Sequence, residues 1–256
     1  MVVLLHALAT TGLLTWYPSI ATLTERYRVV TLDQRCHGRG IRDQGFRIPD
    51  CADDVAALLD ALSIDRAVVA GYSMGGIVAQ RVWRQHPGRV RGLVLAATTD
   101  HFMTTVRERV FHHATGLTMR GLRVRAGAPV AAASDPVTEP VAEPLDLHDW
   151  ALAQMRSTSP VAVAQAVAIL GRHHSRPWLG RIDVPTAVLV TLEDRVFPAE
   201  RQIAMARRIP GATTHEIRAG HACVVRQADR FVPAFAQALH TVHARAEQAE
   251  SASMRR

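Results

Sequence analysis

The stretch "AVVAGYSMGGIVAQRVW", residues 67–83, changes character at a single serine. The apolar run before Gly71 is typical of a buried strand, and the apolar residues after Ser73 recur at helical spacing. A serine at such a turn needs a strained backbone with close neighbours, which glycines at 71 and 75 permit because they lack a Cβ. The helix that starts near Met74 points its free N–H groups towards the serine oxygen. In this context the G-x-S-x-G pattern predicts that Ser73 is a nucleophile.

The sequence around this turn alternates between strand and helix patterns. Runs with strand character lie at 2–5, 27–33, 66–72, 91–97, 185–194 and 212–221. Helical spacing occurs between them, at 16–27, 49–62, 74–86, 199–210 and 227–244. Apolar strands separated by helices predict an α/β fold with a mostly parallel sheet and helices on both faces.

Residues 100–180 interrupt this alternation with helical and Pro/Ala-rich patterns and no strand signal. We therefore expect a core of residues 1–99 and 181–245 with a helical insertion at 100–180. The polar segment 246–256 is expected to be a flexible tail.

Composition and the pattern of apolar runs favour a soluble cytoplasmic protein. The net charge is +7, but the basic residues are all arginines scattered along the chain, so we expect no nucleic-acid partner. No apolar run approaches the roughly 20 residues of a membrane helix, and the apolar start lacks a preceding basic segment, so neither a membrane partner nor secretion is expected. The three cysteines show no C-x-x-C spacing and are interpreted as reduced thiols.

A nucleophilic serine needs a base and an acid, which follow it in chain order on loops after later strands. Asp194 directly follows the run "TAVLVT", and His221 follows "THEIRAG", where Gly220 allows a tight turn. Since parallel strands end at one edge of a sheet, Ser73, Asp194 and His221 are predicted to converge there as catalytic residues.

Other assignments of the acid remain open in the sequence. Asp194 could instead cap the helix near Ala199, and Glu193 is an adjacent carboxylate. Asp100, which follows the strand at 91–97, is a third candidate.

An oxyanion formed during acyl transfer needs two N–H donors. The amide of Met74 follows the nucleophile, and the amide of Leu8 follows the first strand, so both are candidates. His6 is interpreted as a structural hydrogen-bonding residue.

Five motifs in this order resemble those of α/β-hydrolase fold proteins, in the cofactor-free group of small esterases, lactonases and haloperoxidase-like enzymes. They are the oxyanion strand "LLHAL" (4–8), the loop "LDQRCHGRG" (32–40), the elbow "GYSMGG" (71–76), the acid loop "LEDRVFP" (192–198) and the histidine loop "AGHACVV" (219–225). The resemblance covers residues 2–240. It implies a Ser-His-Asp triad made of Ser73, His221 and Asp194.

The chain departs from the family pattern at several positions. Ala7 replaces a glycine of the oxyanion loop, Cys36 and Gly40 replace a glycine and a serine of the next loop, and Leu192 replaces the glycine before the acid. The family's first two antiparallel strands have no counterpart, which predicts either an upstream start or an open sheet edge that needs cover.

The insertion lies where the family carries a helical cap. Phe102, Met103, Trp150 and Met155 are candidates for lining an acyl or alkyl pocket, and a purely structural lid is the alternative. His173 and His174 are adjacent, but no carboxylate or thiol pattern accompanies them, so no metal is expected.

These features predict a serine hydrolase that cleaves a small ester, lactone or thioester through an acyl-enzyme, without a cofactor. A cofactor-free haloperoxidase or perhydrolase with the same triad is an alternative within enzymes. A non-catalytic ligand-binding member of the fold is the alternative outside them. Oligomeric state and substrate identity stay open.

Overall fold

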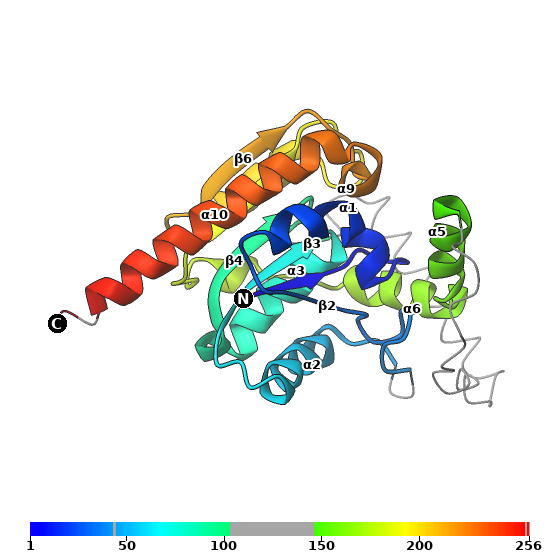
Figure 1. Cartoon of the computed structure of the whole chain (residues 1–256), viewed down its shortest axis with the longest axis horizontal. Helices are drawn as coiled ribbons and strands as arrows, with labels where there is room; N and C mark the ends of the chain where they lie inside the picture. Colours follow the sequence, from blue (N-terminus) through cyan, green and yellow to red (C-terminus); the bar gives the residue numbers. More distant parts are fainter. Residues whose placement is uncertain (43–44, 103–145, 254, 256) are drawn as a thin grey trace.

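A computed structural model describes residues 1–42, 45–102, 146–253 and 255. These residues contain one six-stranded sheet in the order β2-β1-β3-β4-β5-β6, and each neighbouring pair is parallel (Figure 1). The strands are β1 Val2–Leu5, β2 Val29–Leu32, β3 Ala67–Tyr72, β4 Val90–Ala96, β5 Thr186–Thr191 and β6 Thr213–Ile217. The predicted α/β fold with a parallel sheet is confirmed.

Helices connect the strands and cover the sheet. They are α1 Gly12–Thr24, α2 Ile48–Ala61, α3 Met74–Gln85, α5 Leu147–Arg156, α6 Pro160–Leu170, α7 Arg176–Leu179, α8 Ala199–Ala206, α9 Cys223–Arg226 and α10 Ala228–Ser253, with a short 3₁₀ turn, η1, at Pro87–Arg89. Each strand and helix expected outside the insertion is present, with ends that differ by a few residues.

The sheet separates two apolar clusters, which explains why the central strand β1 has no polar face. In β1, Val3 and Leu5 belong to the cluster under α2, α3 and α8, while Val2 and Leu4 belong to the cluster under α1 and α10. All four side chains are fully buried. Because successive side chains of a strand point to opposite faces, a strand covered on both faces is apolar throughout.

The C-terminal segment differs from the flexible tail expected at 246–256. Helix α10 continues through Ser253 and extends past the sheet edge to the far left of Figure 1. Ala246 is buried, and the Glu250 carboxylate accepts two hydrogen bonds from Arg91, at 2.9 and 2.7 Å. These contacts with β4 stabilise turns whose polar sequence looks unstructured on its own.

The insertion is helical where it is described, in α5, α6 and α7. Helix α5 lies against α1, where the ring of Trp150 meets that of Tyr17 at 5.4 Å between centroids. Residues 103–145 lie outside the described part of the chain, so the limits of the insertion stay a prediction.

Among the described strands, β2 has a partner on one side only, β1. The side chains of β2 are all half-buried, in contrast to the buried central strands. Among the described strands, β2 is therefore one of the two edges of the sheet.

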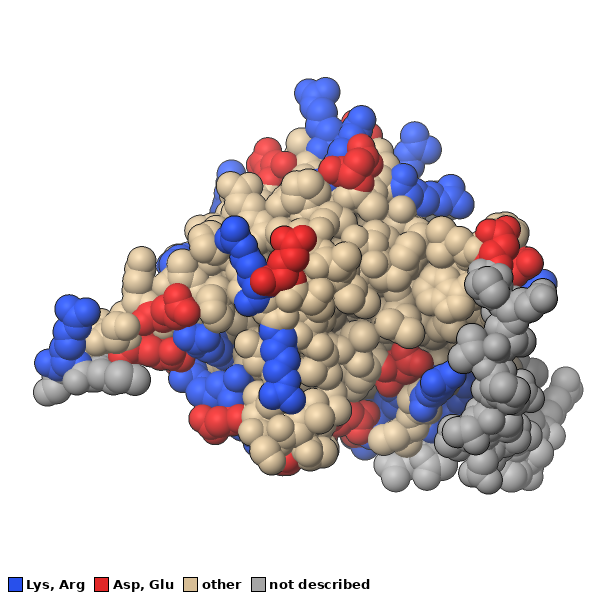
Figure 2. Space-filling view, viewed as in Figure 1, with Lys and Arg blue, Asp and Glu red and all other residues tan. Residues whose placement is uncertain are grey.

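Basic and acidic side chains alternate over the face shown in Figure 2 and do not gather into one patch there. None of the described helices combines the length and hydropathy that a membrane span requires.

Candidate active site

Ser73 occupies a sharp turn between β3 and α3. Its backbone has φ 54° and ψ −116°, a region that residues with a Cβ rarely adopt. Two hydrogen bonds hold this conformation: the Ser73 amide donates to the Ala96 carbonyl at 2.9 Å, and the Thr98 hydroxyl donates to the Ser73 carbonyl at 2.8 Å. The elbow expected from the sequence is therefore present and is braced by the end of β4.

The glycines of the motif are required by backbone contacts. A Cβ added at Gly75 would lie 2.1 Å from the carbonyl oxygen of Leu5, and one added at Gly71 would lie 2.1 Å from that of Gly75. Neither backbone oxygen can move away without disturbing the sheet, so α3 packs against the end of β1 only with glycine at position 75.

We expect Gly75→Ala to lower the free energy of unfolding by about 3 kcal/mol or more, because the new methyl group overlaps backbone atoms. Urea unfolding followed by circular dichroism measures this change. Gly88→Ala is the matched control, since a Cβ at Gly88 meets no atom within 4 Å. Equal stability of the two variants would contradict the packing described here.

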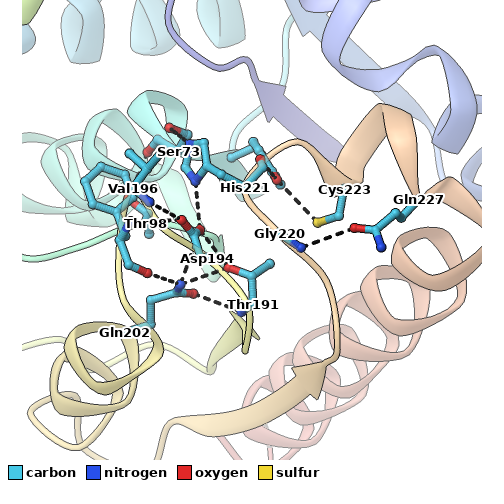
Figure 3. A network of polar contacts seen from close by, with 12 residues as sticks. Ser73, Thr98, Thr191, Asp194, Val196, Gln202, Gly220, His221, Cys223 and Gln227 are labelled. Carbon is cyan, nitrogen blue, oxygen red and sulfur yellow. Dashed lines mark hydrogen bonds and ion pairs between the residues drawn. The ribbon is translucent and has the colours of Figure 1, made fainter.

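The structure brings Ser73, His221 and Asp194 together in one hydrogen-bonded chain (Figure 3). The Ser73 Oγ lies 2.9 Å from His221 Nε2, and His221 Nδ1 lies 2.7 Å from Asp194 Oδ2. The three residues follow β3, β6 and β5, whose carboxyl ends meet at one edge of the sheet. This is the convergence that their positions in the sequence predicted.

The Asp194 carboxylate is surrounded by donors. Its Oδ1 accepts the amides of Val196 and Phe197 at 2.7 and 2.9 Å, and its Oδ2 accepts the Thr191 hydroxyl at 2.8 Å. Burial by itself raises the pKa of this carboxyl, but the hydrogen bond and charge of His221, with these donors, outweigh burial and lower the pKa overall. Asp194 is therefore a carboxylate at neutral pH, able to stabilise a positive charge on His221.

The competing carboxylates lie elsewhere. Asp100 is buried and contacts His101 Nδ1 at 2.5 Å, Arg176 Nε at 3.2 Å and Arg208 at 3.5 Å. Glu193 is exposed. Asp194 binds amides of its own loop and does not cap α8, which begins after Pro198.

Sequence reasoning did not identify the residues that hold the acid loop and the histidine loop in place. The Gln202 amide group donates to Phe197 O at 2.7 Å and to the Thr191 hydroxyl at 2.9 Å, while its oxygen accepts the Thr191 amide at 3.2 Å (Figure 3). The Tyr72 hydroxyl donates to the His221 carbonyl at 2.5 Å. Tyr72 is adjacent to the nucleophile in the motif, but no local signal marks Gln202.

The amides of Leu8 and Met74, the expected oxyanion donors, have no acceptor among residues 1–42, 45–102 and 146–253. The turn that carries Leu8 is held by the Thr10 hydroxyl, which donates to the Ala7 carbonyl at 2.8 Å. The positive φ in this turn, 61°, falls on Ala9, so Ala7 replaces the family's glycine without a left-handed backbone. The oxyanion role of the two amides stays a prediction.

His6 is buried at the base of this loop and is held neutral. Its Nδ1 lies 2.7 Å from the Ala7 carbonyl, and its Nε2 accepts the Gln34 amide at 2.8 Å, which fixes the tautomer with the proton on Nδ1. Burial, then the nearby ring of His37, lowers the pKa of His6 well below its ordinary value of 6.5. The structural role expected for His6 fits this environment.

We expect stability to fall as the pH drops below 6.5, because unfolded His6 binds a proton there and folded His6 does not. His6→Gln removes this difference and should reduce the loss by up to about 1.4 kcal/mol per pH unit. Urea unfolding at a series of acidic pH values compares the two slopes. Equal dependence of the unfolding free energy on pH in the wild type and in His6→Gln would contradict a neutral His6 in the folded protein.

The loop "LDQRCHGRG" has one of its departures from the family pattern at a left-handed position. Cys36, which replaces a glycine, adopts φ 67°, the left-handed conformation that glycine adopts most easily. Asp33 ties the loop to α1 by accepting the amides of Gly12 and Arg39 at 2.7 and 2.8 Å.

The pocket candidates lie in different surroundings. The ring of Phe102 is 5.3 Å from that of Phe197, which in turn is 5.4 Å from the His221 ring, so Phe102 lies near the serine-histidine pair. The described ring contact of Trp150 is with Tyr17 on α1. Met155 is exposed, and Met103 lies outside the described residues. The substrate-binding role of these side chains stays a prediction.

Comparison with known proteins agrees with the fold. Residues 1–225 match the family model described as "alpha/beta hydrolase fold". The chain belongs to the α/β-hydrolase fold family.

Several relatives in this family are named as hydrolases. The chain is 26% identical over 225 residues to 3-oxoadipate enol-lactonase 1 of Acinetobacter baylyi. The aligned region covers 86% of this chain and 81% of the relative. It is 30% identical over 205 residues to the pimeloyl-[acyl-carrier protein] methyl ester esterase of Chromobacterium violaceum. This aligned region covers 74% of this chain and 76% of the relative. The crystal structure of a hydrolase from Pseudomonas aeruginosa PA01 superposes with a TM-score of 0.72 at 25% identity, over 93% of this chain and 89% of that one.

Proposed function

We propose that this α/β-hydrolase is a serine hydrolase that cleaves a small ester, lactone or thioester through an acyl-enzyme. The observation that carries the proposal is the chain of hydrogen bonds from Ser73 Oγ through the His221 ring to the Asp194 carboxylate. Serine becomes nucleophilic when a neighbouring base takes its proton, and a carboxylate on the far ring nitrogen orients that base.

In the first step, His221 Nε2 takes the Ser73 hydroxyl proton while Oγ bonds to the substrate carbonyl carbon. The carbonyl electron pair moves onto oxygen, where the Leu8 and Met74 amides would donate hydrogen bonds. When the C–O or C–S bond breaks, His221 returns the proton to the leaving group. Asp194 holds Nδ1 and stabilises the imidazolium.

In the second step, water replaces the leaving group. His221 takes a proton from water as the water oxygen attacks the acyl carbon, and then returns it to Ser73 Oγ as the acyl bond breaks. The residues at the site can carry out each proton transfer, so we propose a reaction without a cofactor.

The named relatives support this class of substrate. A methyl ester esterase and an enol-lactonase both have names that denote carboxylic-ester bonds. The proposal for this chain extends to a small-molecule substrate and, with the reduced cysteines expected from the sequence, to a cytoplasmic location. The identity of the acyl group depends on the insertion.

A fluorophosphonate probe tests the proposal directly, because it reacts with a serine that an adjacent base has activated. Labelling at Ser73, located by peptide mass spectrometry, supports a serine enzyme. No labelling of folded protein would overturn it in favour of a non-catalytic binding protein. Esters of graded acyl length then define the substrate, and peracid formation measured with the same esters plus peroxide distinguishes a perhydrolase.

A further inference from the structure

A pocket of about 450 Å³ lies at the start of α2, beside the middle of α3 and the segment that follows α6. Its size is within the range of small-molecule sites. Arg81 lines it from α3, eight residues after Ser73, which corresponds to about 12 Å along the helix. The pocket is therefore displaced from the serine hydroxyl, and neither the proposed chemistry nor its oxyanion donors use it.

The lining is basic and lacks a compensating charge. Arg47, Arg81 and Arg172 line the pocket together with two histidines, and none of its described lining residues is acidic. In the described ranges, the guanidinium groups of Arg81 and Arg172 have no carboxylate partner. Arg47 lies 3.7 Å from Asp50, a carboxylate that Arg35 also contacts at 3.4 Å.

The buried carboxylate of Asp100, whose charge acts on His173, has ion-pair partners outside the pocket. Asp100 is 1% exposed and already contacts His101, Arg176 and Arg208. Its charge is therefore matched by its own partners.

One buried polar atom in the pocket wall has no partner. His173 is 8% exposed, and its Nε2 has no hydrogen bond within the described structure. Burial lowers the pKa of His173 to about 3 despite the opposing effect of the Asp100 charge, so the ring is neutral at physiological pH. His173 therefore adds a neutral surface to the pocket wall and no positive charge.

The remaining wall suits an organic body rather than a bare ion. Trp178 lines the pocket and is held by stacking on Trp83, with 6.1 Å between ring centroids and 20° between planes. Ile48 and Ile169 add apolar surface to the same wall.

We propose that this pocket binds a small organic dianion, with its charged group between Arg81 and Arg172 and its carbon skeleton against Trp178. Guanidinium groups bind phosphate and carboxylate oxygens through paired N–H donors. A phosphate monoester and a dicarboxylate share this chemistry, and both carry enough charge to match two uncompensated arginines.

Titration of the wild-type protein at low ionic strength tests the proposal, with inorganic phosphate, phenyl phosphate and succinate as ligands and sodium chloride as the control. Isothermal calorimetry measures affinity, and tryptophan fluorescence reports on Trp178. We expect saturable binding, with one of the two organic dianions tighter than inorganic phosphate. Arg81→Gln and Arg172→Gln should each weaken it by about tenfold, the loss of one charge-assisted contact.

Arg84→Gln is the matched control, since Arg84 is exposed on the same helix and does not line the pocket. It should bind as the wild type does, and Trp178→Phe should abolish the fluorescence change. Equal weakening by Arg84→Gln would indicate non-specific attraction to a basic protein and overturn the proposal. Absence of saturable binding by folded wild type would also overturn it. Neither outcome depends on hydrolysis, so the proposed function is tested separately.

Discussion

Replacement of Ser73 by alanine is expected to lower kcat by about 10⁴-fold or more and leave the fold unchanged, because the residual protein can orient an ester but cannot form an acyl-enzyme. The Ser73 Oγ makes one described side-chain hydrogen bond, to His221 Nε2. Its removal therefore takes away the proposed nucleophile and leaves the backbone contacts to Ala96 and Thr98 in place. Rates with an ester substrate and thermal unfolding measure the two effects.

Ser73→Gly provides a second test of the same position. Like the alanine variant it lacks the hydroxyl, so we expect it to be equally inactive. Glycine adopts φ 54° without the Cβ strain, so this variant should be more stable than Ser73→Ala by about 1 kcal/mol. Turnover retained by both variants would contradict the assignment of Ser73, and equal stabilities would contradict the strained elbow.

Replacement of Asp194 by asparagine should have the second-largest effect, a loss of about 10³- to 10⁴-fold in kcat. Asparagine keeps the size of the side chain but offers no negative charge to an imidazolium. An amide group in place of Oδ2 would also favour the wrong tautomer of His221, whose Nδ1 lies 2.7 Å from that oxygen. Steady-state kinetics on protein whose folding is verified by circular dichroism measures this loss.

Asp100→Asn is the matched control, because the sequence allowed Asp100 as the acid and the structure places it in a separate ion-pair cluster. We expect this variant to be less stable, since it leaves Arg176 and Arg208 beside a neutral group, yet to retain kcat per folded molecule. A large loss of kcat in Asp100→Asn with little change in Asp194→Asn would refute the assignment of the acid.

The main features of the fold were predictable because they are local. A strand such as β1, which is apolar at each of its four residues, indicates burial on both faces. The glycines at 71 and 75 indicate a turn with no room for a Cβ. Since parallel strands end at one edge of a sheet, chain order alone predicted that Ser73, Asp194 and His221 meet.

The side chains that support these residues were not predictable in this way. Gln202 reaches Thr191 and Phe197 across a loop, and Tyr72 reaches the carbonyl of His221, 149 positions along the chain. Each contact depends on where a helix or loop lies against its neighbour, and a single glutamine or tyrosine in a sequence carries no sign of its partner. The helical end of α10 was unpredictable for the same reason, since Glu250 accepts a hydrogen bond from Arg91, which lies on a strand far away in the sequence.

The amino-acid order was sufficient for the class of fold and for the three residues that converge at the sheet edge, because the burial pattern and the turn motifs can be recognised from neighbouring residues. Only the tertiary structure separated Asp194 from the competing Asp100, showed which side chains hold the acid and histidine loops, and brought Arg81, Arg172 and His173 to one pocket. Those contacts join segments far apart in the chain, and their geometry arises only when the helices pack against the sheet.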